Sequence, residues 1–168
     1  MHDQPNLWCW QAAAWRLLAA AVLGLWLSGC AHTSGPPVGS QAAPPAQTAV
    51  ARALWSQAEA WAGVPYRYGG TDRRGVDCSA FVQLTLRERL GRSVPRTTAL
   101  QARAGTPIAH GDMQPGDVVF FRNPQGSRHV GLYLGEGAFV HASQSRGVIV
   151  SRLDSGYWAP RFVAARRL

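Results

Sequence analysis

Lysine is absent from the 168-residue sequence, so its positive charge rests entirely on arginine. The 17 arginines outnumber nine acidic residues and give a formal net charge of +8. Such a surplus fits nucleic acid, anionic lipid or another polyanion as a partner, and it equally fits a solvated basic surface. The arginines are scattered, with only Arg73-Arg74 and Arg166-Arg167 adjacent, so charge alone identifies no partner.

The sequence also lacks an apolar run that could span a bilayer. Leu17 to Leu27 follow Arg16 and form an apolar run of eleven residues, a length typical of a signal peptide. The run ends in Leu27-Ser28-Gly29-Cys30, which resembles a lipobox, the site at which bacterial lipoproteins are cleaved and lipidated. The resemblance implies a signal peptide at residues 1–29, a lipid on Cys30 and a mature chain of 139 residues, enough for one domain.

Cysteine is scarce, with one residue in the signal peptide, one at the lipidation site and one in the folded part. Removal of Cys9 and lipidation of Cys30 leave Cys78 as the only free thiol. Structural cysteines in an oxidising envelope are normally paired. Cys78 is therefore either buried and inert or a reactive thiol.

Composition divides the rest of the chain into a linker and a folded part. Residues 30–50 are rich in proline, alanine, glycine and serine, which predicts a lipidated flexible tether, and residues 51–168 are predicted to fold. The apolar spacing predicts a helix from Ala51 to about Ala62. A second helix is expected from Cys78 to Leu90, with Asp77 as its N-cap and Gly91 placed to cap its C-terminal end.

After Pro115-Gly116 the pattern changes from helices to strands. Turn residues separate four apolar segments, which predict an antiparallel meander at residues 117–121, 129–135, 138–142 and 147–153. Helices followed by an antiparallel sheet indicate an α+β domain, and no internal repeat is visible.

A catalytic thiol needs activation, because the thiolate is the nucleophile and a free cysteine has a pKa of ~8.5. The first turn of a helix favours the ionised form of Cys78, and a histidine normally supplies the base. His110 lies in a turn-rich segment and is predicted to face solvent, whereas His129 and His141 fall inside predicted strands.

The hairpin between these two strands decides whether the histidines can cooperate. A three-residue loop at residues 135–137 pairs Leu134 with Ala138 and places His129 and His141 on one face, with Cβ atoms about 7 Å apart. A two-residue loop would place them on opposite faces. The three-residue loop therefore predicts a nucleophile, Cys78, with a base and an orienting group supplied by His129 and His141.

Two other interpretations of these residues remain. One is a zinc site of one cysteine and two histidines, although CxxC and HxxxH pairs are missing. The other is that both histidines are structural residues of the sheet and that the thiol is inert.

Five motifs together resemble the NlpC-type cell-wall cysteine peptidases, especially the small lipoprotein murein endopeptidases of Gram-negative bacteria. The resemblance covers residues 51–168 and rests on GVPYRYGG (63–70), GVDCSAFVQ (75–83), PGDVVFF (115–121), RHVGLYLG (128–135) and FVHAS (139–143). It implies a papain-like domain, with N-terminal helices packed on a central antiparallel sheet and the nucleophile at a helix N-terminus. It also implies Cys78 as nucleophile, His129 as base, His141 as third catalytic residue, and no cofactor or metal.

The same resemblance implies roles for three further residues. Tyr66 would donate its hydroxyl at the oxyanion hole. Asp77 and Ser79 flank the nucleophile at positions that some relatives use to hold the free amine of a peptide stem.

The resulting expectation is a monomeric peptidoglycan endopeptidase that acts on wall peptide stems. The D-alanyl–diaminopimelate cross-link is the favoured bond; the alternatives are the γ-D-glutamyl–diaminopimelate bond, a non-catalytic wall-binding lipoprotein, and a thiol acyltransferase or amidase. The arginine-rich surface suits the carboxylates of peptide stems, and export disfavours nucleic acid as a partner. Because Ala31 is not the aspartate associated with inner-membrane retention, we expect a lipid anchor in the outer membrane, facing the periplasm.

Overall fold

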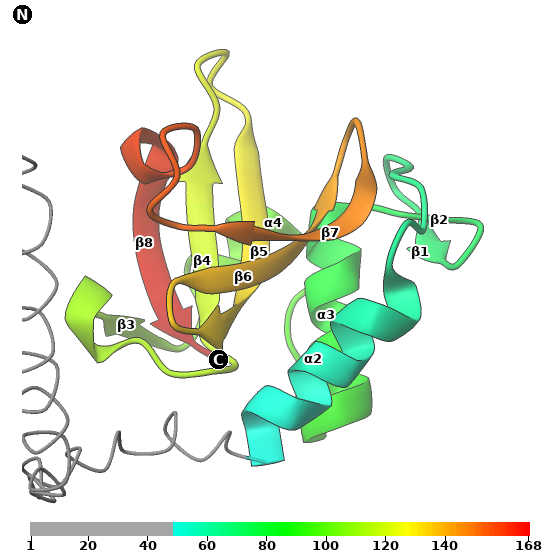
Figure 1. The fold of residues 1–168 in the computed structure, drawn as a ribbon, viewed down its shortest axis with the longest axis horizontal. Helices are drawn as coiled ribbons and strands as arrows, with labels where there is room; N and C mark the ends of the chain where they lie inside the picture. Colours follow the sequence, from blue (N-terminus) through cyan, green and yellow to red (C-terminus); the bar gives the residue numbers. More distant parts are fainter. Residues whose placement is uncertain (1–48) are drawn as a thin grey trace, which may run out of the picture. The chain divides into compact units, whose positions relative to one another are not determined.

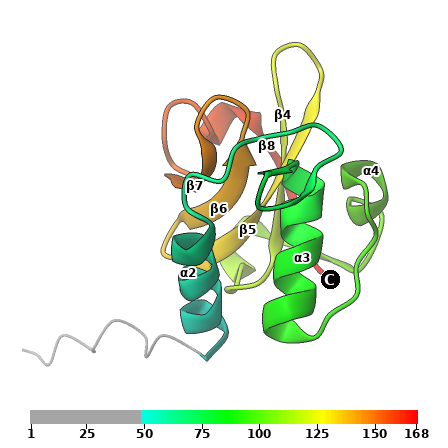
Figure 2. The same cartoon turned by 90° about the vertical axis from the view of Figure 1, so that its right-hand side faces the viewer.

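The computed structural model describes residues 49–168, so the predicted signal peptide, the lipidation site Cys30 and nearly all of the tether lie outside the described residues. The described part contains two long helices and a six-stranded antiparallel sheet (Figure 1). The helices α2 (Ala49–Trp61) and α3 (Cys78–Leu90) lie beside each other and against the sheet (Figure 2). Within residues 49–168, no helix has both the length and the apolar character needed to cross a membrane.

The first helix, α2, forms where the apolar spacing predicted it. Leu54, Ala58 and Trp61 recur on one face and are buried, so burial of this face stabilises the helix. The chain leaves the helix at Gly63, which adopts a φ of 76° that other residues rarely adopt.

The second helix, α3, carries the predicted caps at both ends. Asp77 accepts a hydrogen bond from the Ala80 N–H at 2.8 Å, and Gly91 ends the helix in the left-handed conformation with a φ of 64°. The first five residues, 78–82, are all buried, whereas most of the last turn is exposed. The caps therefore fix Cys78 at the buried end of the helix.

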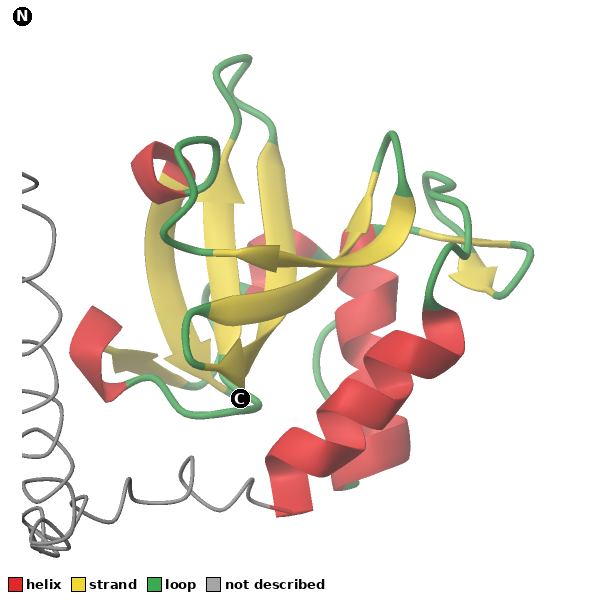
Figure 3. Cartoon of the chain, in the orientation of Figure 1, coloured by secondary structure: helices red, strands yellow, loops and turns green. Residues whose placement is uncertain are grey.

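The large sheet has the strand order β3-β8-β4-β5-β6-β7 (Figure 3). The four predicted strands appear within one residue of their predicted bounds and form the expected meander, whereas β3 and β8 were not predicted. Its strands are β3 (Thr106–Ile108), β4 (Val118–Arg122), β5 (Arg128–Gly135), β6 (Ala138–Ser143), β7 (Gly147–Arg152) and β8 (Phe162–Arg167).

Shorter elements connect these parts. A small hairpin precedes α3, the one-turn helix α4 follows it, and two 3-10 turns flank the central strands. They are β1 (Thr71–Asp72), β2 (Gly75–Val76), α4 (Thr98–Gln101), η1 (His110–Asp112) and η2 (Ala159–Arg161).

The hairpin between β5 and β6 keeps the predicted register along its strands and departs from it at the tip. Leu132 pairs with Val140, as the three-residue loop requires. At the tip, Gly135 rather than Leu134 pairs with Ala138, so the predicted Leu134 pairing is wrong. A register shift at this point explains the difference, because a bulge adds one unpaired residue to β5.

Two apolar clusters lie on the two faces of the sheet. The larger one packs α2 and α3 onto the sheet and includes Cys78 and Val130. The smaller one covers the other face and includes Phe121 and Phe139, with Trp158 packed against it. The thiol therefore belongs to the helix side of the sheet.

Candidate active site

Cys78 is the first residue of α3 and is 8% exposed. Its Sγ lies 3.8 Å from the Thr98 Oγ1. Burial raises the pKa of the Cys78 thiol, and this effect outweighs hydrogen bonds from the Thr98 hydroxyl and from the N–H groups of Val130 and Ser79. The thiol is therefore protonated at neutral pH, and its ionisation requires a base.

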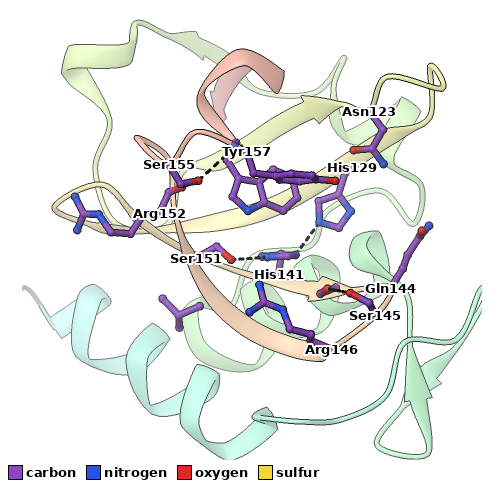
Figure 4. Close-up of a pocket in the computed structure, with 13 residues that line it drawn as sticks. Asn123, His129, His141, Gln144, Ser145, Arg146, Ser151, Arg152, Ser155 and Tyr157 are labelled. Carbon is purple, nitrogen blue, oxygen red and sulfur yellow. Dashed lines mark hydrogen bonds between the residues drawn. The ribbon is translucent and has the colours of Figure 1, made fainter.

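The two histidines of the predicted face form a hydrogen-bonded series with a serine (Figure 4). His129 Nε2 lies 2.9 Å from His141 Nδ1, and His141 Nε2 lies 3.0 Å from the Ser151 Oγ. The His129 ring stacks on Trp158 at a centroid distance of 5.4 Å, and the His141 ring stacks on Phe139 at 5.0 Å. These contacts hold both imidazoles in fixed orientations.

Burial keeps both imidazoles neutral. It lowers the pKa of His129 to about 4. It also lowers the pKa of His141 to about 2, together with the charge that His129 carries once it is protonated and the charge of Arg146. Each neutral ring carries one N–H. If His129 donates from Nε2, His141 accepts at Nδ1 and donates from Nε2 to Ser151. This arrangement leaves His129 Nδ1 free to accept a proton, as a general base must.

The thiol and the base border the same region without touching in this structure. Within residues 49–168 no hydrogen bond joins Cys78 to His129. The backbone of Val130, the next residue after His129, nevertheless acts to lower the pKa of the Cys78 thiol, so β5 brings this neighbour of the base close to the sulfur. Three residues, Thr98, Ala99 and Arg128, line both the pocket that holds Cys78 and the pocket that reaches His129. Catalytic hydrogen bonds are often long in ligand-free enzymes, so the arrangement is compatible with a dyad.

Tyr66, the predicted oxyanion donor, lies in the same pocket as the nucleophile. It shares with Cys78 a pocket of ≈ 590 Å³, and a backbone bridge to Val76 fixes its position just before α3. Burial and the nearby Cys78 raise the pKa of the Tyr66 hydroxyl, although Gln144 lowers it. The hydroxyl therefore keeps its proton and can act as a donor; its catalytic role remains a prediction.

Asp77 is fully engaged within the protein. Its carboxylate accepts hydrogen bonds from the Gly69 N–H at 3.1 Å, the Ser79 hydroxyl at 2.9 Å and Arg96 at 2.6 Å. Burial opposes ionisation, but Arg96, Ala80 and Ser79 hold the pKa of Asp77 below its ordinary value. A substrate amine would have to compete with Arg96 for this carboxylate, and the role of Asp77 and Ser79 in amine binding remains a prediction.

Sequence analysis missed several residues that the structure brings to the site. Ser151 completes the histidine series, Thr98 contacts the thiol, and Arg96 pairs with Asp77. Ser151 could have been found from strand alternation. Ile149 of β7 pairs with His141, and Ser151 lies two residues further along the same strand, on the same face. Arg96 lies in the loop after α3 and Thr98 begins α4, and in neither place does the local pattern indicate a site. His110 is exposed in η1, as predicted.

The zinc alternative is not supported by the geometry. Among the described residues, no group of three or more histidine, cysteine, aspartate or glutamate side chains is placed to hold a metal ion. The two imidazoles instead use the facing nitrogens for a bond to each other.

Comparison with known proteins adds an independent finding. The profile of the NlpC/P60 family matches residues 63–167, which include every predicted catalytic residue. The chain belongs to the NlpC/P60 family. Membership confirms the resemblance drawn from the five motifs and supports a hydrolase of the cysteine-peptidase type.

Curated NlpC/P60 proteins are similar over much of the chain. The probable endopeptidase NlpC of Escherichia coli (strain K12) is 43% identical over 155 residues, which cover 91% of this chain and 99% of that protein. The murein DD-endopeptidase MepS/murein LD-carboxypeptidase of the same organism is 46% identical over 108 residues, which cover 64% of this chain and 57% of that protein.

The fold is also shared with solved NlpC/P60 structures. The crystal structure of an NlpC/P60 family protein from Bacillus cereus superimposes with a TM-score of 0.64 and 31% identity. The match covers 70% of this chain and 39% of that chain. The predicted α+β, papain-like architecture is thereby confirmed.

Proposed function

We propose that this chain is a peptidoglycan endopeptidase that cleaves an amide bond of wall peptides through the Cys78 thiolate. The observation that carries the proposal is the hydrogen-bonded series of His129, His141 and Ser151. Its first member, His129, lines a pocket that adjoins the pocket of Cys78. Relatives named as an endopeptidase and as a murein DD-endopeptidase support the substrate class.

The first half of the reaction transfers the acyl group to the enzyme. His129 Nδ1 takes the thiol proton, and the Cys78 Sγ attacks the amide carbonyl to form a tetrahedral oxyanion. His129 then gives this proton to the leaving amine as the carbon–nitrogen bond breaks. His141 and Ser151 stabilise the transient imidazolium of His129. His141 Nδ1 accepts a hydrogen bond from its Nε2–H, and Ser151 in turn accepts one from His141.

The oxyanion requires donors that are already in place. The Tyr66 hydroxyl and backbone N–H groups around Cys78 fill this role, and each such donor stabilises the transition state by about 3 kcal/mol. In the second half, water loses a proton to His129 and attacks the thioester. The carbon–sulfur bond then breaks, the carboxylic acid leaves, and the proton returns to Cys78.

The bond that we favour is the cross-link between D-alanine and diaminopimelate. The relative named as a murein DD-endopeptidase supports this choice, at 46% identity over 108 residues. Cleavage of the γ-D-glutamyl–diaminopimelate bond uses the same chemistry and is the alternative outcome of the test below. A lipid on Cys30 and a tether to residue 50 would hold the monomeric domain at the outer membrane, within reach of the wall.

The proposal is tested by digestion of purified, cross-linked murein sacculi with the full-length chain, beside a Cys78→Ala variant. Released muropeptides are identified by mass spectrometry. We expect cross-linked dimers to disappear and monomers to accumulate only when Cys78 is present. Stems shortened at the γ-D-glutamyl bond would keep the mechanism and change the bond. Absence of any product that depends on Cys78 would reject the hydrolase and favour a binding protein or another acyl substrate.

A further inference from the structure

Two arginines face each other across neighbouring strands beside the active site. Arg122 ends β4, Arg128 begins β5, and the two are direct cross-strand partners. Like charges at directly opposite positions destabilise a sheet. The repulsion between Arg122 and Arg128 therefore destabilises this end of the sheet. A bound anion would offset the repulsion while the protein acts on its substrate.

A third arginine and the base share a pocket with this pair. Arg103, which follows α4, lines with Arg122 and Arg128 a pocket of ≈ 190 Å³ that His129 also lines. None of the residues that line this pocket is acidic, and half of them are apolar. The lining residues are Thr98, Ala99, Ala102, Arg103, Phe120, Phe121, Arg122, Arg128, His129 and Val163. Among residues 49–168, no salt bridge neutralises any of the three guanidinium groups.

The pocket adjoins the nucleophile. Arg128, Thr98 and Ala99 also line the pocket of ≈ 590 Å³ that holds Cys78. The other cation of that pocket, Arg96, is neutralised by Asp77 at 2.6 Å. A ligand group near the scissile bond would therefore meet uncompensated positive charge on the side of Arg128.

We propose that Arg103, Arg122 and Arg128 form a carboxylate-binding subsite that selects wall peptides whose acidic residues carry free carboxylates over peptides in which these groups are amidated. The inference rests on the proposed function and names a determinant of its substrate. A guanidinium pairs with a carboxylate through two parallel hydrogen bonds, and it loses this partner when the carboxylate becomes an amide. A flat anionic membrane is the less suitable ligand, because the charges line a pocket that shares three of its residues with the pocket of the nucleophile.

The test compares a cross-linked muropeptide dimer that has free carboxylates with the same dimer in amidated form. For the full-length chain, we expect kcat/KM to be at least about tenfold higher for the free acid. The Arg122→Gln/Arg128→Gln variant should lose most of this preference. The control variant Arg87→Gln/Arg92→Gln removes the same charge near the C-terminal end of α3 and should keep it.

A second measurement separates binding from folding. Because the double variant removes a like-charge pair, its melting temperature should equal or exceed that of the unchanged chain. An unchanged preference in this variant, or a lowered melting temperature together with a general loss of activity, would overturn the subsite. Unchanged peptide selection with weaker binding to vesicles of anionic lipid would also overturn it, in favour of a membrane contact.

Failure of the proposed function has a different signature. If neither dimer is cleaved, calorimetric titration of both dimers into the Cys78→Ala chain still measures the subsite. Tighter binding of the free acid, lost in Arg122→Gln/Arg128→Gln, would support the subsite without the hydrolase. Equal binding of both dimers would reject it.

Discussion

At the scale of single residues, the site depends on groups that fix the histidines and the thiol. Ser151 is the last member of the histidine series and accepts a hydrogen bond when His129 is the base. Thr98 is the side chain hydrogen-bonded to the Cys78 sulfur. Both can be changed without removal of a reacting atom, so each tests the geometry of the site.

Substitution of Ser151 by alanine should lower kcat about 10- to 100-fold with little change in KM. The change leaves a buried N–H of His141 without a partner, a cost of about 1–3 kcal/mol that acts on the orientation of the base. Steady-state kinetics on a soluble muropeptide dimer measure the effect. Ser145→Ala is the control, because Ser145 is exposed and lines the pocket that His129, His141 and Ser151 also line (Figure 4). Equal losses in both variants would contradict a role in positioning.

Substitution of Thr98 by valine should raise the pKa of the Cys78 thiol further. The hydroxyl stabilises the thiolate, and valine has a similar shape but no donor. The rate of iodoacetamide alkylation as a function of pH reports this pKa. Thr98→Ser keeps the hydroxyl and should behave like the unchanged chain. An identical pH profile for the valine variant would show that Thr98 does not act on the thiol.

At the scale of elements, the β5–β6 hairpin sets the distance between the histidines. Gly131 lies on β5 and packs closely against β6. A Cβ added at this position would lie 2.7 Å from the Val140 carbonyl oxygen and 2.8 Å from the Phe139 ring. Neither a ladder carbonyl nor a fully buried ring can move easily. The glycine therefore permits the close packing that orients His141.

Substitution of Gly131 by alanine should lower the free energy of unfolding by about 1–3 kcal/mol, the typical cost of overpacking. Urea denaturation followed by circular dichroism measures the change. Gly111→Ala is the matched control, because an added Cβ there meets no atom within 4 Å, and its effect should stay within about 0.5 kcal/mol. A Gly131 variant as stable as this control would show that the hairpin can relax.

At the scale of the whole molecule, the buried histidines couple stability to pH. In the folded state the pKa of His129 is about 4 and that of His141 about 2, whereas an unfolded histidine titrates near pH 6.5. Between these values the unfolded chain binds more protons than the folded chain. Stability is therefore fully present above about pH 6.5 and is lost as the pH falls toward 4.

We expect the free energy of unfolding to decrease by about 2–4 kcal/mol between pH 7 and pH 5. Urea denaturation at several pH values measures this slope. His141→Gln should make the slope shallower, even if the variant is less stable at pH 7, and the exposed His110→Gln should leave it unchanged. A stability that is constant over this range would mean that the imidazoles are accessible to protons.

The C-terminal strand shows why sequence patterns explained part of the fold only. Arg166-Arg167 was considered as surface charge, yet these residues end β8, and Arg167 donates to the buried carboxylate of Asp117 at 2.8 Å. The partners are 50 residues apart. A local pattern of charge cannot indicate such a pair, so β8 and its neighbour β3 were missed.

The sequence by itself determined the features that depend on neighbours along the chain. Capping by Asp77, the left-handed Gly91 and the alternation that placed His129 and His141 on one face follow from backbone geometry and side-chain period. These local rules, with the five motifs, were sufficient to predict the fold class and to place the two histidines together.

Only the tertiary structure decided which groups surround the reactive atoms. Thr98 at the thiol, Ser151 at the end of the histidine series and Arg96 on Asp77 depend on how loops and strands pack. Packing also reversed one expectation, since burial raises the pKa of Cys78 although the first turn of a helix favours the thiolate. The physical reason is that desolvation depends on all atoms around a group, and these come from every part of the chain.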